Sequence, residues 1–196
     1  MMICEQWFPT PIWYGKFNNI SDQDYINAIN YCNSLSTNST GRVLSNAGGW
    51  QSEDLYYKDC IDTPLQIFFE QLKPSYQEAL NDLGVTRELK LGNFWVNINN
   101  YNDKNLVHDH PLSSISGCFY LTDNNSSIVF YRNRDISSVH LNMLFSNKNT
   151  NLSYQETRYI PVRGQYLIFP SWLMHSVEPN TSTEKRISIA FNVSII

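Results

Sequence analysis

The sequence predicts a mainly β fold in which a jelly roll, or double-stranded β-helix, packs against helices from the N-terminal part of the chain. Apolar residues recur at helical spacing early in the sequence, the period changes to two at about residue 88, and short strand-like segments separated by turn residues follow. The chain has 196 residues, of which 42% are hydrophobic, enough for one sizeable core. We therefore expect a single domain, with residues 1–86 as mostly helical support and residues 87–196 as the jelly-roll core.

Two helices are expected before the strands. The first covers residues 21–35, where Ser21 and Asp24 form a capping-box pattern and apolar residues recur at every third position. The second runs from Thr63–Pro64 to Gly84, because a polar residue followed by proline is typical of a helix start and glycine of a helix end.

The strands are predicted from alternation and from turn signals. Phe94, Val96 and Ile98 alternate with polar or aromatic neighbours, which indicates a strand beginning near residue 88. Asn-rich and Gly-containing turns separate further expected strands, which cover residues 115–121, 127–131, 158–162, 165–169 and 186–195. Residues 135–155 form a polar, weakly patterned insertion.

Composition disfavours several classes of protein. Lys and Arg total 14 against 18 for Asp and Glu, and no dense basic run is present, so nucleic acid is not expected as the main ligand. No segment approaches the roughly 20 apolar residues of a membrane span, and the N-terminus lacks a signal-peptide pattern. The four cysteines are scattered and form no zinc or disulfide pattern; they are Cys4, Cys32, Cys60 and Cys118. We therefore expect a protein of a reducing compartment, the cytoplasm.

Two of the four histidines fall in the segment His108-Asp109-His110. In an extended strand His108 and His110 project to the same face and can bind one metal ion, while Asp109 points the other way. Pro111 favours an extended conformation at His110. A bulge here would instead turn Asp109 inward, and two polar surface histidines would have the same spacing.

The C-terminal third places further candidates close together in sequence. His175 follows an apolar strand, and a new strand begins at Arg186. A guanidinium forms a planar two-pronged bond to a carboxylate and keeps its charge when it is buried. Ser188, two residues later, lies on the same face of that strand.

Five segments together carry a resemblance to a known family. They are Gly48–Ser52, Trp95–Asn97, His108–Pro111, Ser116–Leu121 and Phe169–Asn192. With them the chain resembles the iron(II)- and 2-oxoglutarate-dependent oxygenases, specifically a family of small phage or bacterial proteins in the prolyl-hydroxylase-like superfamily. The resemblance covers most of the chain.

The resemblance implies an Fe(II) site. His108 and His175 are then iron ligands, and His110 occupies the place of the usual carboxylate ligand. A neutral imidazole in place of a carboxylate leaves the site one charge more positive, and imidazole suits Fe(II).

The resemblance also implies a 2-oxoglutarate site. Arg186 matches the arginine that binds the distal carboxylate of this co-substrate. Tyr120 matches a tyrosine of prolyl-hydroxylase-like relatives that donates to the same carboxylate. Ser188 and Ser116 are expected to line the same site.

The primary hypothesis is therefore an Fe(II) dioxygenase that uses 2-oxoglutarate and O2 to hydroxylate a substrate that the sequence does not identify; oligomeric state stays open. One alternative is a cupin-like metalloprotein that does not use 2-oxoglutarate, although the acidic residue expected between His110 and Tyr120 is missing. The other is a non-catalytic jelly-roll binding or structural module. A visible charge-transfer band of Fe(II) with 2-oxoglutarate distinguishes the first from both.

Weaker candidates have an ordinary structural explanation. Trp50, Trp95, Trp172 and Tyr131 are candidates for a substrate cleft, although aromatic residues at strand spacing are more often core. Two arginines beside a hairpin strand and one histidine in the insertion are more often solvent-exposed; they are Arg132, Arg134 and His140.

Overall fold

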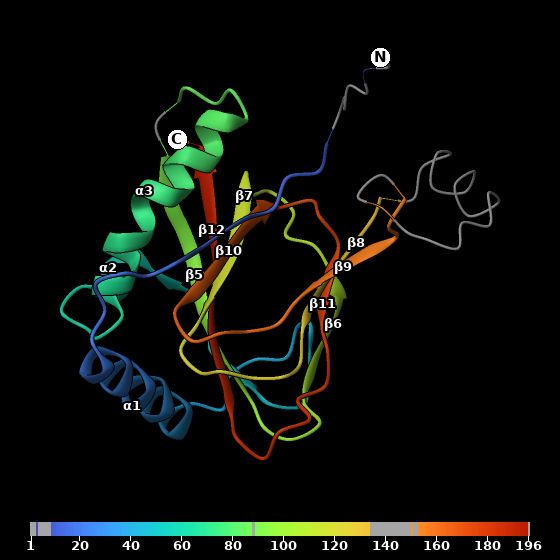
Figure 1. Cartoon of the computed structure of the whole chain (residues 1–196). Helices are drawn as coiled ribbons and strands as arrows, with labels where there is room; N and C mark the ends of the chain where they lie inside the picture. The colour runs from blue at the N-terminus through green and yellow to red at the C-terminus, as the bar shows by residue number, and fades with distance from the viewer. Residues whose placement is uncertain (1–2, 4–8, 88, 134–149, 151–152, 196) are drawn as a thin grey trace.

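The computed structural model describes residue 3, residues 9–87, 89–133 and 150, and residues 153–195. It has three layers: helices, a large sheet against which they pack, and a smaller sheet on the other side (Figure 1). The helices are α1 (Asp22–Asn38), the short α2 (Tyr57–Cys60) and α3 (Gln66–Asp82).

Both sheets are antiparallel. The large sheet has the order β1 (Trp13–Lys16), β10 (Gln165–Pro170), β7 (Ile115–Tyr120), β12 (Arg186–Ile195), β5 (Leu89–Asn99) and β3 (Trp50–Gln51), with β4 (Leu55–Tyr56) also pairing with β5. The small sheet has the order β2 (Asn46–Ala47), β6 (Lys104–His108), β11 (His175–Val177), β8 (Ile128–Tyr131) and β9 (Glu156–Tyr159). Two facing antiparallel sheets with helices against one of them confirm the predicted jelly roll.

The two long helices confirm the sequence prediction, with α1 extending to Asn38 beyond the expected end at residue 35 and α3 beginning later than expected. Ser21 accepts from the Asp24 main-chain N–H at 3.2 Å, and the Asp24 carboxylate accepts from the Ser21 N–H at 2.9 Å, which completes the expected capping box. Helix α3 begins at Gln66 rather than at Thr63–Pro64. The Gln66 N–H donates to the Thr63 carbonyl at 3.1 Å, so the proline lies in a turn that precedes the helix.

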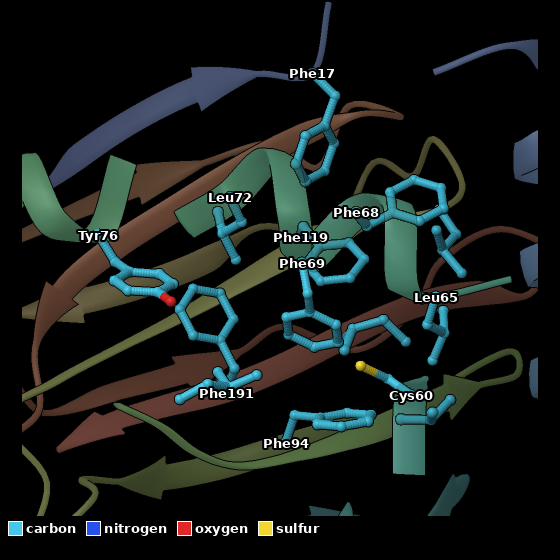
Figure 2. Close-up of a cluster of buried hydrophobic side chains, with 14 of the residues drawn as sticks. Phe17, Cys60, Leu65, Phe68, Phe69, Leu72, Tyr76, Phe94, Phe119 and Phe191 are labelled. Carbon is cyan, nitrogen blue, oxygen red and sulfur yellow. The ribbon is translucent and has the colours of Figure 1, made fainter. Parts of the chain in front are cut away.

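An aromatic core joins helix α3 to the large sheet (Figure 2). The ring of Phe68 stacks on Phe119 of β7 at 5.5 Å between centroids, and Phe69 packs on Phe94 of β5 at 4.6 Å. Phe191 of β12 lies 6.4 Å from Phe69 in an edge-to-face arrangement. These contacts fix the strands that form one wall of the space between the sheets.

Alternation along β12 separates the core from the inter-sheet space. Ile187, Ile189 and Phe191 belong to the helix-side core. Arg186 and Ser188, on the opposite face, line a cavity between the sheets. The period of two that predicted the strand therefore also places polar groups where a site can form.

The expected strands at 115–121, 127–131, 165–169 and 186–195 correspond to β7, β8, β10 and β12, whereas β9 lies two residues earlier than the predicted 158–162. The short strands β1–β4, β6 and β11 have two to five residues each, too few to show a period. Most of the insertion at 135–155 lies outside the described residues. None of the helices in the described part of the chain is long and apolar enough to cross a lipid bilayer.

Candidate metal and co-substrate site

His108, His110 and His175 meet at the edge of the space between the two sheets. His108 ends β6 and pairs in register with His175, which opens β11, while the His110 N–H donates to the Ser171 carbonyl at 2.9 Å. One ring nitrogen from each histidine lies within 4.8 Å of the others. Asp109, between the first two, is exposed. The chain therefore brings three imidazoles together without turning Asp109 inward.

Hydrogen bonds set the tautomers of the three rings. His108 and His175 each place Nδ1 against the main-chain carbonyl oxygen two residues earlier, at 2.7 and 2.8 Å, and His110 places Nδ1 at 2.8 Å from Oδ1 of Asn192. An oxygen of this kind only accepts, so each Nδ1 carries the proton and each Nε2 keeps its lone pair. Nε2 of His110 is buried with no hydrogen-bond partner in the described chain. This orphaned acceptor and the two matching rings fit a divalent metal ion.

Burial keeps the three imidazoles neutral. It is the main cause that lowers the pKa of His110 to about 4 and the pKa of His175 well below its usual value, and the neighbouring His108 acts in the same direction on both. Burial also lowers the pKa of His108. Only a neutral imidazole binds a metal, so the site is ready for one at neutral pH.

Arg186 is a buried cation with one unused donor. Its side chain is 1% exposed, and Nη1 donates to the main-chain carbonyls of Glu178 at 3.1 Å and Ser126 at 3.4 Å. Nη2 is buried without a partner in the described chain. Burial lowers the pKa of Arg186 to about 10 because the charge is removed from water. A buried guanidinium with a free N–H is suited to a carboxylate ligand.

One narrow cavity of about 40 Å³ connects these groups. The three histidines and Arg186 all line it, together with Tyr120 and Ser188. Tyr120 is 3% exposed, and its hydroxyl accepts from the Cys118 thiol at 3.4 Å, which leaves the phenolic hydrogen for another acceptor. Burial raises the pKa of Tyr120 well above its usual value, so the phenol is a neutral donor.

Ser116 lies elsewhere than expected. It is absent from the lining of this cavity, and its hydroxyl donates to Oδ1 of Asn192 at 2.7 Å, the same oxygen that His110 contacts. Ser116 lies four positions before Tyr120 on β7, so it shares a face with Tyr120, and its contact with Asn192 places it beside His110. Ser116 therefore shares the Asn192 oxygen with His110 and does not line the narrow cavity, where it was expected.

A second, wider cleft opens beside His108 and His110, with a volume of about 480 Å³. Its wall includes Trp95, which also lines the narrow cavity. The other expected aromatics, Trp50, Trp172 and Tyr131, line neither space, and neither does Arg132 in the described chain. Arg134 and His140 lie outside the described residues.

Several polar residues of the site were missed from the sequence. Asn97 lines the narrow cavity and buries an Oδ1 with no partner among the described residues. A chain of hydrogen bonds connects His110 to Asn192, Asn93 and Asp54. These last three residues all line the wide cleft. The alternation of β5 places Asn97 on the same face as Trp95, and this signal was present in the sequence.

Comparison with known proteins gives a consistent result. Residues 93–192 match the model of a family described as "Putative 2OG-Fe(II) oxygenase". No curated protein shows significant similarity to the chain.

Solved structures share the fold at low sequence identity. The non-heme alpha-ketoglutarate-dependent carbocyclase SnoK from nogalamycin biosynthesis is 13% identical with a TM-score of 0.63, over 94% of this chain and 79% of SnoK. A Pseudomonas putida prolyl-4-hydroxylase is 12% identical with a TM-score of 0.62, over 93% of this chain and 92% of the hydroxylase. HygX from Streptomyces hygroscopicus, solved with nickel and 2-oxoglutarate, is 12% identical with a TM-score of 0.63, over 95% and 83% of the two chains.

Proposed function

The chain belongs to the 2-oxoglutarate- and Fe(II)-dependent oxygenase family, and from this premise we propose that His108, His110 and His175 bind the iron and that Arg186 binds the distal carboxylate of 2-oxoglutarate. The observation that carries the proposal is a single cavity lined both by three imidazoles whose Nδ1 atoms are hydrogen-bonded, which leaves each Nε2 for a metal, and by a buried guanidinium whose Nη2 has no partner among the described residues. Tyr120 and Ser188 supply neutral hydrogen-bonding groups to the same cavity.

Bound iron supplies the redox chemistry, in which O2 and 2-oxoglutarate yield succinate and CO2 and one oxygen atom enters a substrate C–H bond as a hydroxyl. The residues of the chain bind and orient the reactants. Arg186 fixes one end of the co-substrate, and the neutral histidines hold the metal at the other. Apolar side chains of Ile128, Phe169 and Val177 line the same cavity and exclude water from it.

We assign the wide cleft beside His108 and His110 to the hydroxylated substrate, because it is open and much larger than the narrow cavity. Its lining combines apolar Leu106 and Val107 with the Arg42–Asp54 ion pair. This lining offers little positive charge for a phosphate backbone, which supports a small molecule or a protein side chain over nucleic acid.

We place the protein in a cytoplasm, that of the host if a phage encodes it. Cys32, Cys60 and Cys118 are buried free thiols, which suits a reducing compartment. Fractionation of cells that produce the protein tests this placement, and recovery from an oxidising compartment would contradict it.

Turnover without a substrate tests the proposed activity. The purified protein is incubated with Fe(II), 2-oxoglutarate and O2, and succinate is measured by mass spectrometry. We expect succinate to form only when iron is present, and to fall sharply in Arg186→Met at a limiting 2-oxoglutarate concentration. Arg163→Met is the matched control, since Arg163 is a surface residue that pairs with Asp22. A protein that binds iron but neither binds 2-oxoglutarate nor forms succinate would instead be the cupin-like metalloprotein.

A further inference from the structure

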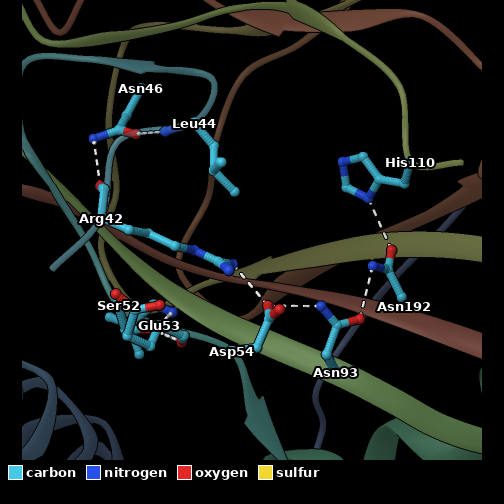
Figure 3. Close-up of polar contacts among 10 residues, drawn as sticks. Arg42, Leu44, Asn46, Ser52, Glu53, Asp54, Asn93, His110 and Asn192 are labelled. Carbon is cyan, nitrogen blue, oxygen red and sulfur yellow. Dashed lines mark hydrogen bonds and ion pairs between the residues drawn. The ribbon is translucent and has the colours of Figure 1, made fainter.

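A continuous chain of hydrogen bonds runs from the metal-facing His110 to a carboxylate (Figure 3). His110 Nδ1 lies 2.8 Å from Oδ1 of Asn192, and Nδ2 of Asn192 donates to Oδ1 of Asn93 at 2.9 Å. Nδ2 of Asn93 donates to Oδ1 of Asp54 at 2.7 Å, and Arg42 donates to the same oxygen at 2.7 Å. The residues come from β5, β12 and three loops, so only the folded chain assembles them.

The carboxylate gives this chain a direction. An ionised Asp54 can only accept, so Asn93 must present its NH2 group to Asp54 and its oxygen to Asn192. Asn192 must then present its NH2 group to Asn93 and its oxygen to His110. The proton of His110 is thereby fixed on Nδ1, which leaves Nε2 free. Burial raises the pKa of Asp54, but hydrogen bonds from Arg42 and Asn93 outweigh it and hold the pKa below its usual value, so Asp54 stays ionised.

Among the described residues that contact Asn93 or Asn192, none but Asp54 imposes this direction. Ser116 contacts Oδ1 of Asn192, but a hydroxyl rotates to donate or accept and does not choose between the two orientations of an amide. The tautomers of His108 and His175 are fixed by main-chain carbonyls instead. His110 is thus the one ligand of the three whose tautomer depends on side chains, and it occupies the place where relatives of this superfamily carry an acid.

We propose that Asp54 is a positioning residue for His110, and that it acts through Asn93 and Asn192 to hold the ring in the tautomer that binds metal. The proposal rests on the proposed function only in taking His110 as a metal ligand. Outer-shell partners of this kind change metal affinity by about 10- to 100-fold when they are lost.

An exchange of two side chains provides the test. The variants at positions 54 and 93 are made in the Arg42→Gln background, because Arg42 donates to the same Asp54 oxygen as Asn93 and would hold an amide at position 54 with its oxygen toward Asn93. In that background the amide of Asp54→Asn presents either its oxygen or its NH2 group to Asn93, so the direction is lost. In the double variant Asp54→Asn/Asn93→Asp the carboxylate moves one position closer, still only accepts, and again orients Asn192. Arg42→Gln is the matched control, because it removes the ion pair and leaves the carboxylate.

Two measurements are made on each protein. Two-bond proton–nitrogen correlation spectra of metal-free protein with ¹⁵N-labelled histidine show which ring nitrogen carries the proton, with His110 assigned from His110→Gln and His108 and His175 as internal references. Zn(II) affinity is measured by competition with a chromophoric chelator. Thermal unfolding followed by circular dichroism verifies that each variant is folded.

We expect the Nδ1-protonated ring of His110 in the unaltered protein, in Arg42→Gln and in the double variant, and a mixture of tautomers in Asp54→Asn. Zn(II) affinity should fall about tenfold in Asp54→Asn and recover in the double variant. An unaltered protein with the proton on Nε2, or an Asp54→Asn protein with unchanged tautomer and affinity, would overturn the proposal. If Asp54→Asn does not fold, the double variant decides, since mixed tautomers in that folded protein contradict the proposal. A protein that passes these tests but makes no succinate refutes the oxygenase activity and leaves the role of Asp54 intact.

Discussion

Replacement of Arg186 by methionine should separate ligand binding from folding. Burial lowers the pKa of Arg186 from the ordinary 12.5 to about 10, so the ligand-free protein spends on the order of 3 kcal/mol to keep the charge. Methionine removes that cost, but it also removes the donor to the carbonyls of Ser126 and Glu178, at roughly 1 kcal/mol each. The two effects offset one another, and the free energy of unfolding of the ligand-free protein should change by about 1 kcal/mol or less.

The effect on 2-oxoglutarate should be much larger. A charge-assisted hydrogen bond to a carboxylate contributes about 1.5 to 3 kcal/mol, so Arg186→Met should weaken 2-oxoglutarate binding about 10- to 150-fold. Zn(II) affinity should stay the same, since Arg186 is not one of the three clustered metal-ligand candidates.

Isothermal titration of 2-oxoglutarate into Zn(II)-loaded protein measures this affinity, and urea unfolding measures stability. Arg163→Met controls for the loss of one surface charge. Equal 2-oxoglutarate affinities in Arg186→Met and the unaltered protein would refute the assignment. A loss of several kcal/mol of stability would show that Arg186 is a structural cation.

Three further predictions concern the same site. Tyr120→Phe keeps the ring and loses one neutral donor, so titration should show 2-oxoglutarate binding weakened by about 0.5 to 1.5 kcal/mol, less than for Arg186→Met; a protein unfolded at ambient temperature would show that the Tyr120 hydroxyl is structural. After dialysis, Asp109→Ala and His110→Asp should retain the metal, whereas His110→Ala should lose most of it. Loss of the metal in Asp109→Ala together with its retention in His110→Ala would place Asp109 at the metal. Burial gives folded His110 a pKa of about 4 against an ordinary 6.5, so between these pH values the unfolded chain binds a proton that the folded chain does not. His110 should therefore contribute on the order of 3 kcal/mol to the fall in the free energy of unfolding of metal-free protein from pH 7 to pH 4, and the fall should be smaller by about that amount in His110→Gln; equal slopes in urea titrations would contradict a buried, neutral His110.

Much of the architecture follows from local patterns. The alternation from Arg186 onward predicted β12 to its last residue, because each strand face meets a different environment. The capping box predicted the start of α1. The short strands lacked any periodic signal, since their position depends on pairing with distant partners rather than on their own residues.

The candidate site was predictable only in part. His108, His110 and His175 were found from spacing and resemblance, and the structure brings them together. The support behind His110 was not predictable, because Asn192 lies 82 residues away in sequence and reaches His110 only after β12 has paired with β5 and β7. Asp54 joins through a loop beside β4, and no local pattern connects it to a histidine.

Anaerobic absorption spectroscopy tests the central claim most directly. Protein loaded with Fe(II) is titrated with 2-oxoglutarate in the absence of O2, and a visible charge-transfer band is recorded. The account predicts that the band appears with both components, is absent with Zn(II), and requires a higher 2-oxoglutarate concentration, by about 10- to 150-fold, in Arg186→Met. A protein that binds both Fe(II) and 2-oxoglutarate and shows no such band would contradict it.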